Sequence, residues 1–350
     1  MMKTEEEHEE EGDVYAYDYE TRDVKVYHAA QLHQENKGES EGRSPRRVVV
    51  GIDEAGRGPV LGPMVYACAF WDEALNEGDG KRYMADYDDS KQLSEARREQ
   101  LFRAVERDER VGFATRVLHA RELSNAMLCG NGKVNLNTLS HNAAIDLVLA
   151  VMDVDNGRRF KVTEVFVDTV GDPNKYREKL ERAFAGKGVE RVTVTSKADS
   201  LFKVVSAASI VAKVSRDRIL KRWHFDEGDV VVDQSTETGS GYPSDPTTKE
   251  WLRRTIDPVF GFPSLVRFSW QTCKTILEEK AVEFVWECER EEEEADGPKK
   301  KAKKPRPTGK PPICETISYA PKRHGYFRSR NMQRSALGVD KTSAAAAPLW

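Results

Sequence analysis

The sequence predicts an α/β domain that is followed by a helical C-terminal portion. Short runs of β-branched and aromatic residues recur along the chain between glycines and charged residues, which indicates buried strands. Between these runs lie segments in which apolar residues recur three and four positions apart, a pattern typical of helices that bury one face. Strands mixed with helices in this way favour a layered α/β architecture.

Five strands are predicted from the apolar runs. The first run, RVVVGID, ends at the carboxylate Asp53, and the fourth run, EVFVDTV, carries Asp168 near its end. The predicted strands span residues 47–53, 64–71, 111–118, 164–170 and 190–196.

Capping residues mark the starts of the predicted helices. Ser94 precedes one periodic segment, and Asp172 followed by Pro173 opens another. The segment 198–223 is predicted to be one long, largely buried helix, whose small residues at 206–209 allow close packing. The predicted helices span residues 94–108, 135–153, 172–184, 198–223, 245–254 and 270–287.

Composition divides the chain into a folded part and two charged flanks. The protein has 350 residues, of which 39% are hydrophobic, but its mean hydropathy of −0.66 is low. We therefore expect an acidic, disordered extension at residues 1–45, a folded domain at residues 46–288 and a charged, disordered tail at residues 289–350. The net charge of −4 does not exclude a nucleic-acid binder, because a near-neutral domain can carry a basic groove beside an acidic cluster.

Several classes of protein are excluded by the sequence. No apolar run approaches the roughly 18 residues that a membrane span needs, and the acidic N-terminus is unlike a secretory signal. The five cysteines lie far apart without a CxxC pair, so we expect a reducing compartment and neither a zinc site nor a disulfide framework. The basic stretch PKKKAKKPRP, residues 298–307, is typical of a nuclear import signal, a nucleic-acid patch or a solvated tail.

Four carboxylates stand at the ends of predicted elements: Asp53, Glu54, Asp168 and Asp199. Any one of them alone is more simply a turn residue or a helix cap. Together they favour a site, because ligands of open α/β sheets bind beyond the ends of adjacent strands. Crowded carboxylates need a compensating cation, and hard oxygen ligands suit Mg²⁺ or Mn²⁺.

The acidic pair continues into a glycine-rich segment, DEAGRGPVLGP, residues 53–63. Gly56, Gly58 and Gly62 with two prolines predict a tight turn whose backbone N–H groups face a phosphate or a sugar. The spacing matches neither a dinucleotide fingerprint nor a Walker loop. A tight hairpin-like turn without a ligand is the alternative.

The chain resembles the type 2 ribonuclease H family, and in particular the catalytic subunits of its eukaryotic members. The resemblance covers roughly residues 47–287. It is carried by seven stretches in family order: GIDEAGRGPVLGPMVYA, DSKQLSEARRE, KVNLNTLSHNAA, VFVDTVGDPNKY, KADSLFKVVSAASIVAKVSRD, GSGYPSDPTTKEWL and PVFGFPSLVRFSWQT. It implies a ribonuclease-H-like fold, namely a mixed five-stranded sheet flanked by helices with a helical C-terminal extension.

The resemblance also implies roles for individual residues. The four carboxylates match the family's metal ligands, which hold two Mg²⁺ or Mn²⁺ ions. Gly56, Arg57 and Gly58 match a loop that contacts the ribose 2′-OH, and Tyr242 matches a tyrosine that engages the same hydroxyl. Other residues match positions near the substrate backbone: Ser90, Lys91, Lys213 and Arg216. An ordinary tyrosine packed on its loop and ordinary solvated lysines are the alternatives.

The implied activity is hydrolysis of the RNA strand of RNA–DNA hybrids and cleavage 5′ of single ribonucleotides in duplex DNA, leaving 3′-OH and 5′-phosphate ends. This activity would serve ribonucleotide excision and RNA primer removal in the nucleus. The implied partners are such hybrids and two non-catalytic subunits, B and C, in a heterotrimer, without a membrane. Two other hypotheses are a hybrid-binding protein without catalysis and a transposase-like or resolvase-like nuclease. The intact acids oppose the first, and the GRG loop with the GSGYP tyrosine opposes the second.

Overall fold

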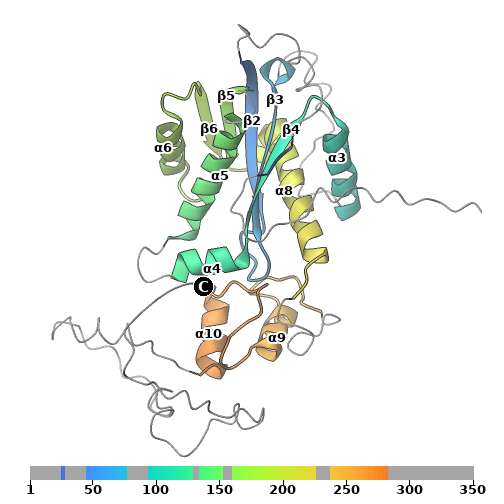
Figure 1. Ribbon diagram of the computed structural model, residues 1–350, viewed down its shortest axis with the longest axis vertical. Coiled ribbons are helices and arrows are strands. Elements are labelled where there is room, and N and C mark those ends of the chain that lie inside the picture. Colours follow the sequence, from blue (N-terminus) through green and yellow to red (C-terminus); the bar gives the residue numbers. More distant parts are fainter. Residues whose placement is uncertain are drawn as a thin grey trace, which may run out of the picture.

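A computed structural model describes residues 45–76, 94–128, 134–152, 160–225 and 237–282, together with the strand Lys25–Tyr27 (Figure 1). Ser90, Lys91 and the basic stretch 298–307 lie outside the described residues. The predicted flanks also lie outside, apart from Pro45 and Lys25–Tyr27, so the predicted domain boundaries remain predictions.

The predicted mixed sheet is confirmed, and its strands follow the order β1-β4-β3-β2-β5-β6. Strands β2 and β3, β3 and β4, and β1 and β4 pair antiparallel, whereas β5 is parallel to both β2 and β6. The strands are β1 (Lys25–Tyr27), β2 (Arg46–Ala55), β3 (Met64–Asp72), β4 (Gly112–Leu118), β5 (Phe160–Asp168) and β6 (Arg191–Thr195).

Strand β1 is a difference from the sequence-based expectation. It comes from the segment that we expected to be mostly disordered, and it adds a sixth strand beside the five that were predicted. Pairing with β1 satisfies backbone groups of β4 that would otherwise lie at the edge of the sheet.

Most of the helices begin where the sequence predicts that they begin. Ser94 and Asp172 cap α3 and α6 as predicted, by accepting hydrogen bonds from backbone N–H groups of the first turn. The helix α4 was not predicted, because its nine residues are too few to show a clear period. The helical elements are η1 (Glu73–Asn76), α3 (Glu95–Arg107), α4 (Ala120–Leu128), α5 (Leu136–Met152), α6 (Pro173–Phe184), α7 (Ala198–Leu201), α8 (Lys203–Lys221), α9 (Pro246–Thr255) and α10 (Gln271–Lys280).

Two predicted helices have different limits in the structure. The prediction of one long helix at residues 198–223 is wrong, because Phe202 adopts an extended conformation and separates the short helix α7 from α8. The Phe202 ring packs on Phe166 of β5, with a centroid distance of 4.4 Å. The helix predicted to reach residue 287 ends at Lys280, where Ala281 turns into an extended conformation. Among the described residues, no helix has the length and apolar character that crossing a membrane requires.

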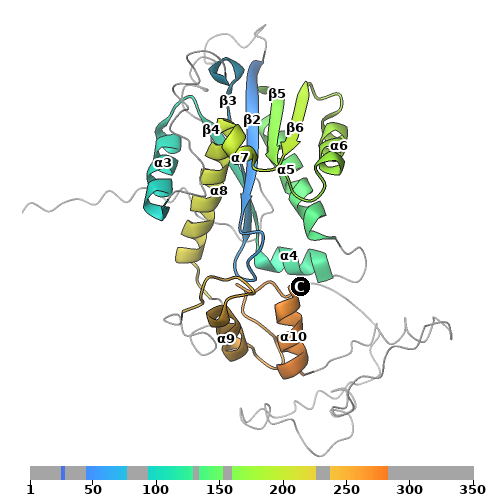
Figure 2. The ribbon, with the colours of Figure 1, turned by 180° about the vertical axis from the view of Figure 1, so that it is seen from behind.

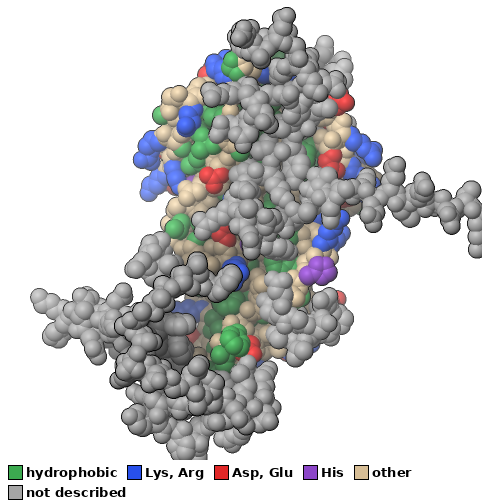
Figure 3. Space-filling view, viewed as in Figure 1, with side chains coloured by type: hydrophobic (Ala, Val, Ile, Leu, Met, Phe, Trp, Pro, Cys, Tyr) green, Lys and Arg blue, Asp and Glu red, His purple; other side chains and the backbone are tan. Residues whose placement is uncertain are grey.

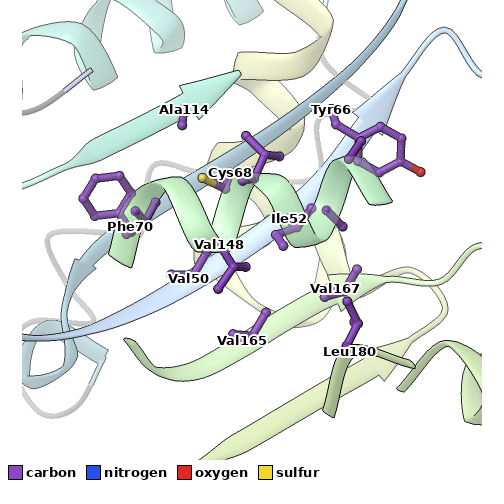
Figure 4. Close-up of a cluster of buried hydrophobic side chains, with 14 of the residues drawn as sticks. Val50, Ile52, Tyr66, Cys68, Phe70, Ala114, Val148, Val165, Val167 and Leu180 are labelled. Atoms are coloured by element: carbon purple, nitrogen blue, oxygen red, sulfur yellow. The ribbon is translucent and has the colours of Figure 1, made fainter. Parts of the chain in front are cut away.

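Helices cover both faces of the sheet, α5 and α6 on one face and α3, α7 and α8 on the other (Figures 1 and 2). Alternation along β2 assigns Val48, Val50 and Ile52 to the α5 face, and Val50 and Ile52 are labelled in the cluster drawn in Figure 4. Val49 lies on the α8 face. Gly51 also faces α8, because a Cβ atom on it would lie 2.3 Å from the Val204 carbonyl carbon.

The C-terminal portion packs below the sheet on the glycine-rich segment. A third cluster of buried side chains joins Val60 and Leu61 of that segment to α9, α10 and the loop between them. The segment after β2 is therefore held between the sheet and the C-terminal helices, which fixes its position at the carboxyl end of β2.

Candidate functional site

Asp53 and Asp168 lie side by side on the α8 face of the sheet. The parallel strands β2 and β5 pair in a register that sets Ile52 opposite Val167, so the next residues on the two strands are Asp53 and Asp168. Both carboxylates follow the strand alternation on to the face that carries Phe166 and α8. Asp53 is 5% exposed and accepts a hydrogen bond from the backbone N–H of Glu54, at 2.8 Å.

Asp199 lies on the helix α7, which begins at the end of β5. The backbone N–H of Ala198 donates to Asp168 Oδ1 at 3.1 Å, which places the start of α7 against the end of β5. Lys197, just before α7, adopts a left-handed conformation with φ of 58°, and the chain turns sharply there. Asp199 is buried, and its Oδ1 accepts from the Ser200 N–H at 3.1 Å. The break at Phe202 therefore puts Asp199 on a separate turn rather than on a long helix.

Glu54 points to the opposite face of the sheet from Asp53, because neighbouring strand residues alternate. It pairs across the strands with Tyr66, which belongs to the α5 face (Figure 4). The Oε2 atom of Glu54 is buried and has no hydrogen-bond partner among the described residues. An orphaned buried carboxylate oxygen is costly, and a cation or a water molecule would satisfy it.

Burial disfavours the ionised form of the Asp53 and Glu54 carboxyl groups. Burial raises the pKa of Asp53 above its ordinary range, and the charge of Asp168 raises it further, although the hydrogen bond from Ser209 opposes the shift. Burial likewise raises the pKa of Glu54, with the Asp53 charge as the next cause. Lys213 of α8 lies close enough to lower the pKa of Asp53.

The residues fit a divalent cation by donor type and by charge. Their donors are hard carboxylate oxygens, and a cation would offset the repulsion that raises the pKa values. As the side chains stand, no three Asp, Glu, His or Cys groups in the described part of the chain lie together as a set of metal ligands. One oxygen of each of Asp53, Asp168 and Asp199 accepts a hydrogen bond from a backbone N–H, and a carboxylate that accepts one such bond keeps lone pairs for a cation.

We predict that the metal-free protein loses stability through this site as the pH rises. Since folding raises the pKa of Asp53 and Glu54, the folded state holds protons that the unfolded state releases, and stability falls above the ordinary carboxyl range. The Asp53→Asn variant lacks one of these charges, so its melting temperature relative to wild type should rise between about pH 5 and about pH 8. Scanning calorimetry with a chelator measures the difference, and a difference that stays constant over this range would contradict the prediction.

The glycine-rich segment is held by two arginines that sequence reasoning did not join to it. Arg267, which is fully buried, donates to the carbonyls of Gly56 (2.6 Å), Arg57 (3.2 Å) and Gly62 (2.7 Å). Arg216 donates from Nε to the Pro63 carbonyl and from Nη2 to the Leu61 carbonyl, both at 3.1 Å. Gly56 has φ of 77°, and a Cβ on it would collide with the Arg216 side chain, so this position requires glycine.

Tyr242 lies against the same segment. A Cβ atom on Gly58 would come within 3.1 Å of Tyr242 Cε1, so the ring and the glycine are neighbours. The two loops are joined by a 2.7 Å hydrogen bond from the Val60 N–H to the Gly241 carbonyl. Tyr242 is 50% exposed, which leaves much of its ring open to a ligand.

The structure therefore brings most of the predicted residues to one end of the sheet, but in different ways. The residues that were predicted to contact phosphate differ in their surroundings: the charge of Lys213 lowers the pKa of Asp53, whereas two nitrogens of Arg216 bind loop carbonyls. Sequence reasoning missed the part that Arg267 and Ser209 take in the site. A lone arginine within the apolar stretch SLVRFSW was the available signal for Arg267.

Cys68 and Cys273 are buried free thiols.

Basic side chains flank the body of the molecule. Figure 3 shows Lys and Arg side chains on both sides of the visible face, over α6 and over α3. Both helices are rich in them, with sequences PNKYREKLERAF and EARREQLFRAVER. Acidic side chains lie between the two flanks in the same view.

Comparisons with known proteins agree with this geometry. The model of the family described as Ribonuclease HII matches residues 50–273. The chain is similar to the A subunit of ribonuclease H2 from Rattus norvegicus, with 46% identity over 77% of this chain and 88% of the rat protein. The corresponding protein of Homo sapiens is 46% identical over 74% of this chain and 84% of its own length. The solved ribonuclease H2 of Pyrococcus horikoshii OT3 is similar with a TM-score of 0.51 and 31% identity, over 66% of this chain and 98% of that one.

Proposed function

Because this chain belongs to the ribonuclease HII family, we propose that it is a ribonuclease H, an endonuclease that hydrolyses the RNA strand of RNA–DNA hybrids. The observation that carries the proposal is the pairing of Asp53 and Asp168 at the ends of two parallel strands, next to a glycine-rich loop that faces Tyr242. An acidic pair beside a glycine-rich loop suits hydrolysis of a phosphodiester next to a ribose.

The finer reaction in this proposal is cleavage on the 5′ side of a ribonucleotide, including a single one within duplex DNA. The products would carry 3′-OH and 5′-phosphate ends. Such a reaction would serve the excision of ribonucleotides from DNA and the removal of RNA primers. The relatives named above support the coarser activity, and the site residues supply the reason for the finer one.

The four carboxylates would hold two divalent cations, Mg²⁺ or Mn²⁺. Such ions, when bound, supply a water of lowered pKa and neutralise charge on the phosphate and the departing 3′ oxygen. Asp53 and Asp168, which are adjacent on the sheet, would hold these ions together with Glu54 and Asp199. The Ser209 hydrogen bond would keep the Asp53 carboxylate oriented.

The loop and Tyr242 would select the ribose. Gly58 is exposed beside the Tyr242 ring, and its backbone would contact a sugar hydroxyl, which is the group that distinguishes RNA from DNA at one position. Tyr242 would add its hydroxyl to the same contact and its ring to the neighbouring sugar. Ser90, Lys91, Lys213 and Arg216 remain our proposals for contacts near the substrate backbone.

Removal of the Tyr242 ring should reduce selectivity more than activity. We expect Tyr242→Ala to lower the rate on a duplex with one ribonucleotide by about tenfold or more relative to its effect on a long hybrid, which is the size of one lost polar contact. The Tyr242→Phe variant should have a rate ratio between those of the wild type and Tyr242→Ala, since it keeps the ring and lacks only the hydroxyl. Single-turnover cleavage of both substrates gives this ratio. Equal losses on the two substrates would rule out a sensing role for Tyr242.

Cleavage of duplex DNA that carries one ribonucleotide, with Mg²⁺ or Mn²⁺, tests the proposed function directly. Cutting at the 5′ side of the ribonucleotide by the wild type supports it. Tight binding to hybrids without cutting, in the complete assembly, would favour a binding protein instead. Absence of both would reject the proposal.

We also propose that the chain works with two non-catalytic subunits, B and C, in a heterotrimer within the nucleus. The relatives are named as one lettered subunit of ribonuclease H2, which supports a multi-subunit assembly. The basic stretch at residues 298–307 would serve nuclear import. Purification of the tagged chain from its own cells, followed by identification of what copurifies in equal amount, tests the assembly.

A further inference from the structure

The side chain of Arg57 is directed at α5. Its Nη1 donates to the Ser140 hydroxyl and its Nη2 donates to Asn137 Oδ1. These acceptors stand three residues apart on one face of the helix, so one guanidinium reaches both. Arg57 lies at the centre of the glycine-rich loop, and this pair of contacts ties the loop to α5.

We propose that Asn137 and Ser140 are positioning residues for substrate selection: they hold the Arg57 side chain and so fix the Gly56–Gly58 loop for the ribose 2′-OH. We call the three residues the Arg57 anchor. The inference rests on the proposed function and assigns the sugar contact to the backbone of the loop rather than to the guanidinium.

Ser140 is a fixed acceptor. It is fully buried, and its hydroxyl donates to the Leu136 carbonyl at 2.8 Å. With its hydrogen used there, the oxygen has lone pairs for Arg57. The helix that carries it is anchored in the core by Ala144, Leu147 and Val148. The contact with Ser140 therefore fixes the loop to a rigid helix.

Asn137 connects the anchor to the acidic end of β5. It packs on Gly171, where a Cβ would lie 2.9 Å from Asn137 Nδ2, and Gly171 follows Asp168 by three residues. Gly171 also has φ of 78°, so it leaves room for this contact in a conformation that suits glycine. One side chain thus contacts both the residue that holds the loop and the turn that follows Asp168.

Packing alone would not hold Arg57 in this position. A cavity of about 340 Å³ lies beside it and is lined also by Gly58, Leu136 and Trp270, so the side chain has room to move. In addition, the first turn of a helix disfavours a cation because of the helix dipole. The two acceptors offset this unfavourable position, which explains why specific side chains are needed there.

The test is a double-mutant cycle on the full chain in its active assembly, with metal-free affinity as the readout. Fluorescence anisotropy in a chelator measures the affinity for a duplex with one ribonucleotide and for the same duplex in all-DNA form. We expect Asn137→Ala with Ser140→Ala to lower the ratio of these affinities by about tenfold, as for loss of a hydrogen bond to a charged group. Arg57→Ala should lower it equally, and the triple variant no further.

Two further variants separate positioning from folding. Asn137→Asp keeps the acceptor oxygen and should keep the ratio, whereas Asn142→Ala removes a surface hydrogen bond to Lys179 on the same helix and should not change it. Thermal melting of every variant identifies a loss of fold.

A ratio unchanged in the double variant, or losses that multiply in the triple variant, would overturn the anchor. Failure of Asn137→Asp to keep the ratio in a folded protein would overturn it as well. If the wild type neither distinguishes the two duplexes nor cuts a hybrid, the proposed function fails first, and the anchor's role in selection fails with it.

Discussion

Replacing Asp168 by asparagine is expected to lower the rate of hybrid cleavage by about a thousandfold or more, which is about 4 kcal/mol of transition-state stabilisation. Asp168 has the same length and shape as asparagine, so the variant loses one negative charge and almost nothing else. A neutral amide beside Asp53 would weaken the hold on divalent cations, whose neutralisation of phosphate charge the proposed reaction would use.

The fold should survive this change. Asp168 Oδ1 accepts from the Ala198 N–H, and an asparagine oxygen can accept the same bond. The charge that raises the pKa of Asp53 would disappear, so the metal-free variant should be at least as stable as the wild type. Thermal melting with a chelator checks this, and metal-free binding of the hybrid should be preserved.

Asp172→Asn is a matched control for the same chemical change. Asp172 lies four residues further along and caps α6 by accepting from the N–H groups of Asn174 and Lys175, which asparagine can also do. Its cleavage rate should stay within about twofold of the wild type, as for an exposed substitution. Substantial metal-dependent cleavage by Asp168→Asn would show that this carboxylate does not hold the catalytic ions.

Much of the fold was predictable because burial leaves a clear pattern in short segments. The runs VVVGID and MVYACAFW lie in strands β2 and β3, and capping side chains marked the starts of α3 and α6. Strand order depends on pairing between distant segments, so it was not predicted, and the mixed character of the sheet came from the family resemblance rather than from periodicity. The break at Phe202 was not predictable from its neighbours, because its ring packs on Phe166 of β5, distant in sequence.

The candidate site was predictable in composition but not in arrangement. Strand alternation implies that Asp53 and Glu54 face opposite sides, and their contacts with Ser209 and Tyr66 agree with this. The supports of the loop were not predictable. Arg267 lies more than two hundred residues after Gly56, and an arginine between apolar residues gives no sign of which carbonyls it binds.

The largest loss of stability is expected from Arg267→Met, at about 3–5 kcal/mol. The methionine fills similar space but cannot donate, so the carbonyls of Gly56, Arg57 and Gly62 lose a buried partner. The variant would also lose the stacking of the guanidinium on Trp270, 4.8 Å from the ring centroid. Denaturant unfolding measures the change, with the exposed Arg177→Met as a control within about 0.5 kcal/mol of wild type.

The cost of burying the charge of Arg267 opposes this loss of stability. Arg267 is a buried cation that makes no ion pair with a carboxylate of the described residues, and burial together with the charge of Arg216 lowers its pKa to about 9. Removing the cation removes the free-energy cost of burying its charge, which stabilises the fold. Removing three hydrogen bonds destabilises the fold. We expect the second effect to win, because each buried carbonyl left without a donor costs about 1–3 kcal/mol. Arg267→Lys should also destabilise, since one ammonium cannot span the carbonyls of Gly56 and Gly62. A methionine variant as stable as the wild type would mean that the charge costs as much as the loop contacts contribute, and that the loop is held by Arg216 and the Gly241 contact instead.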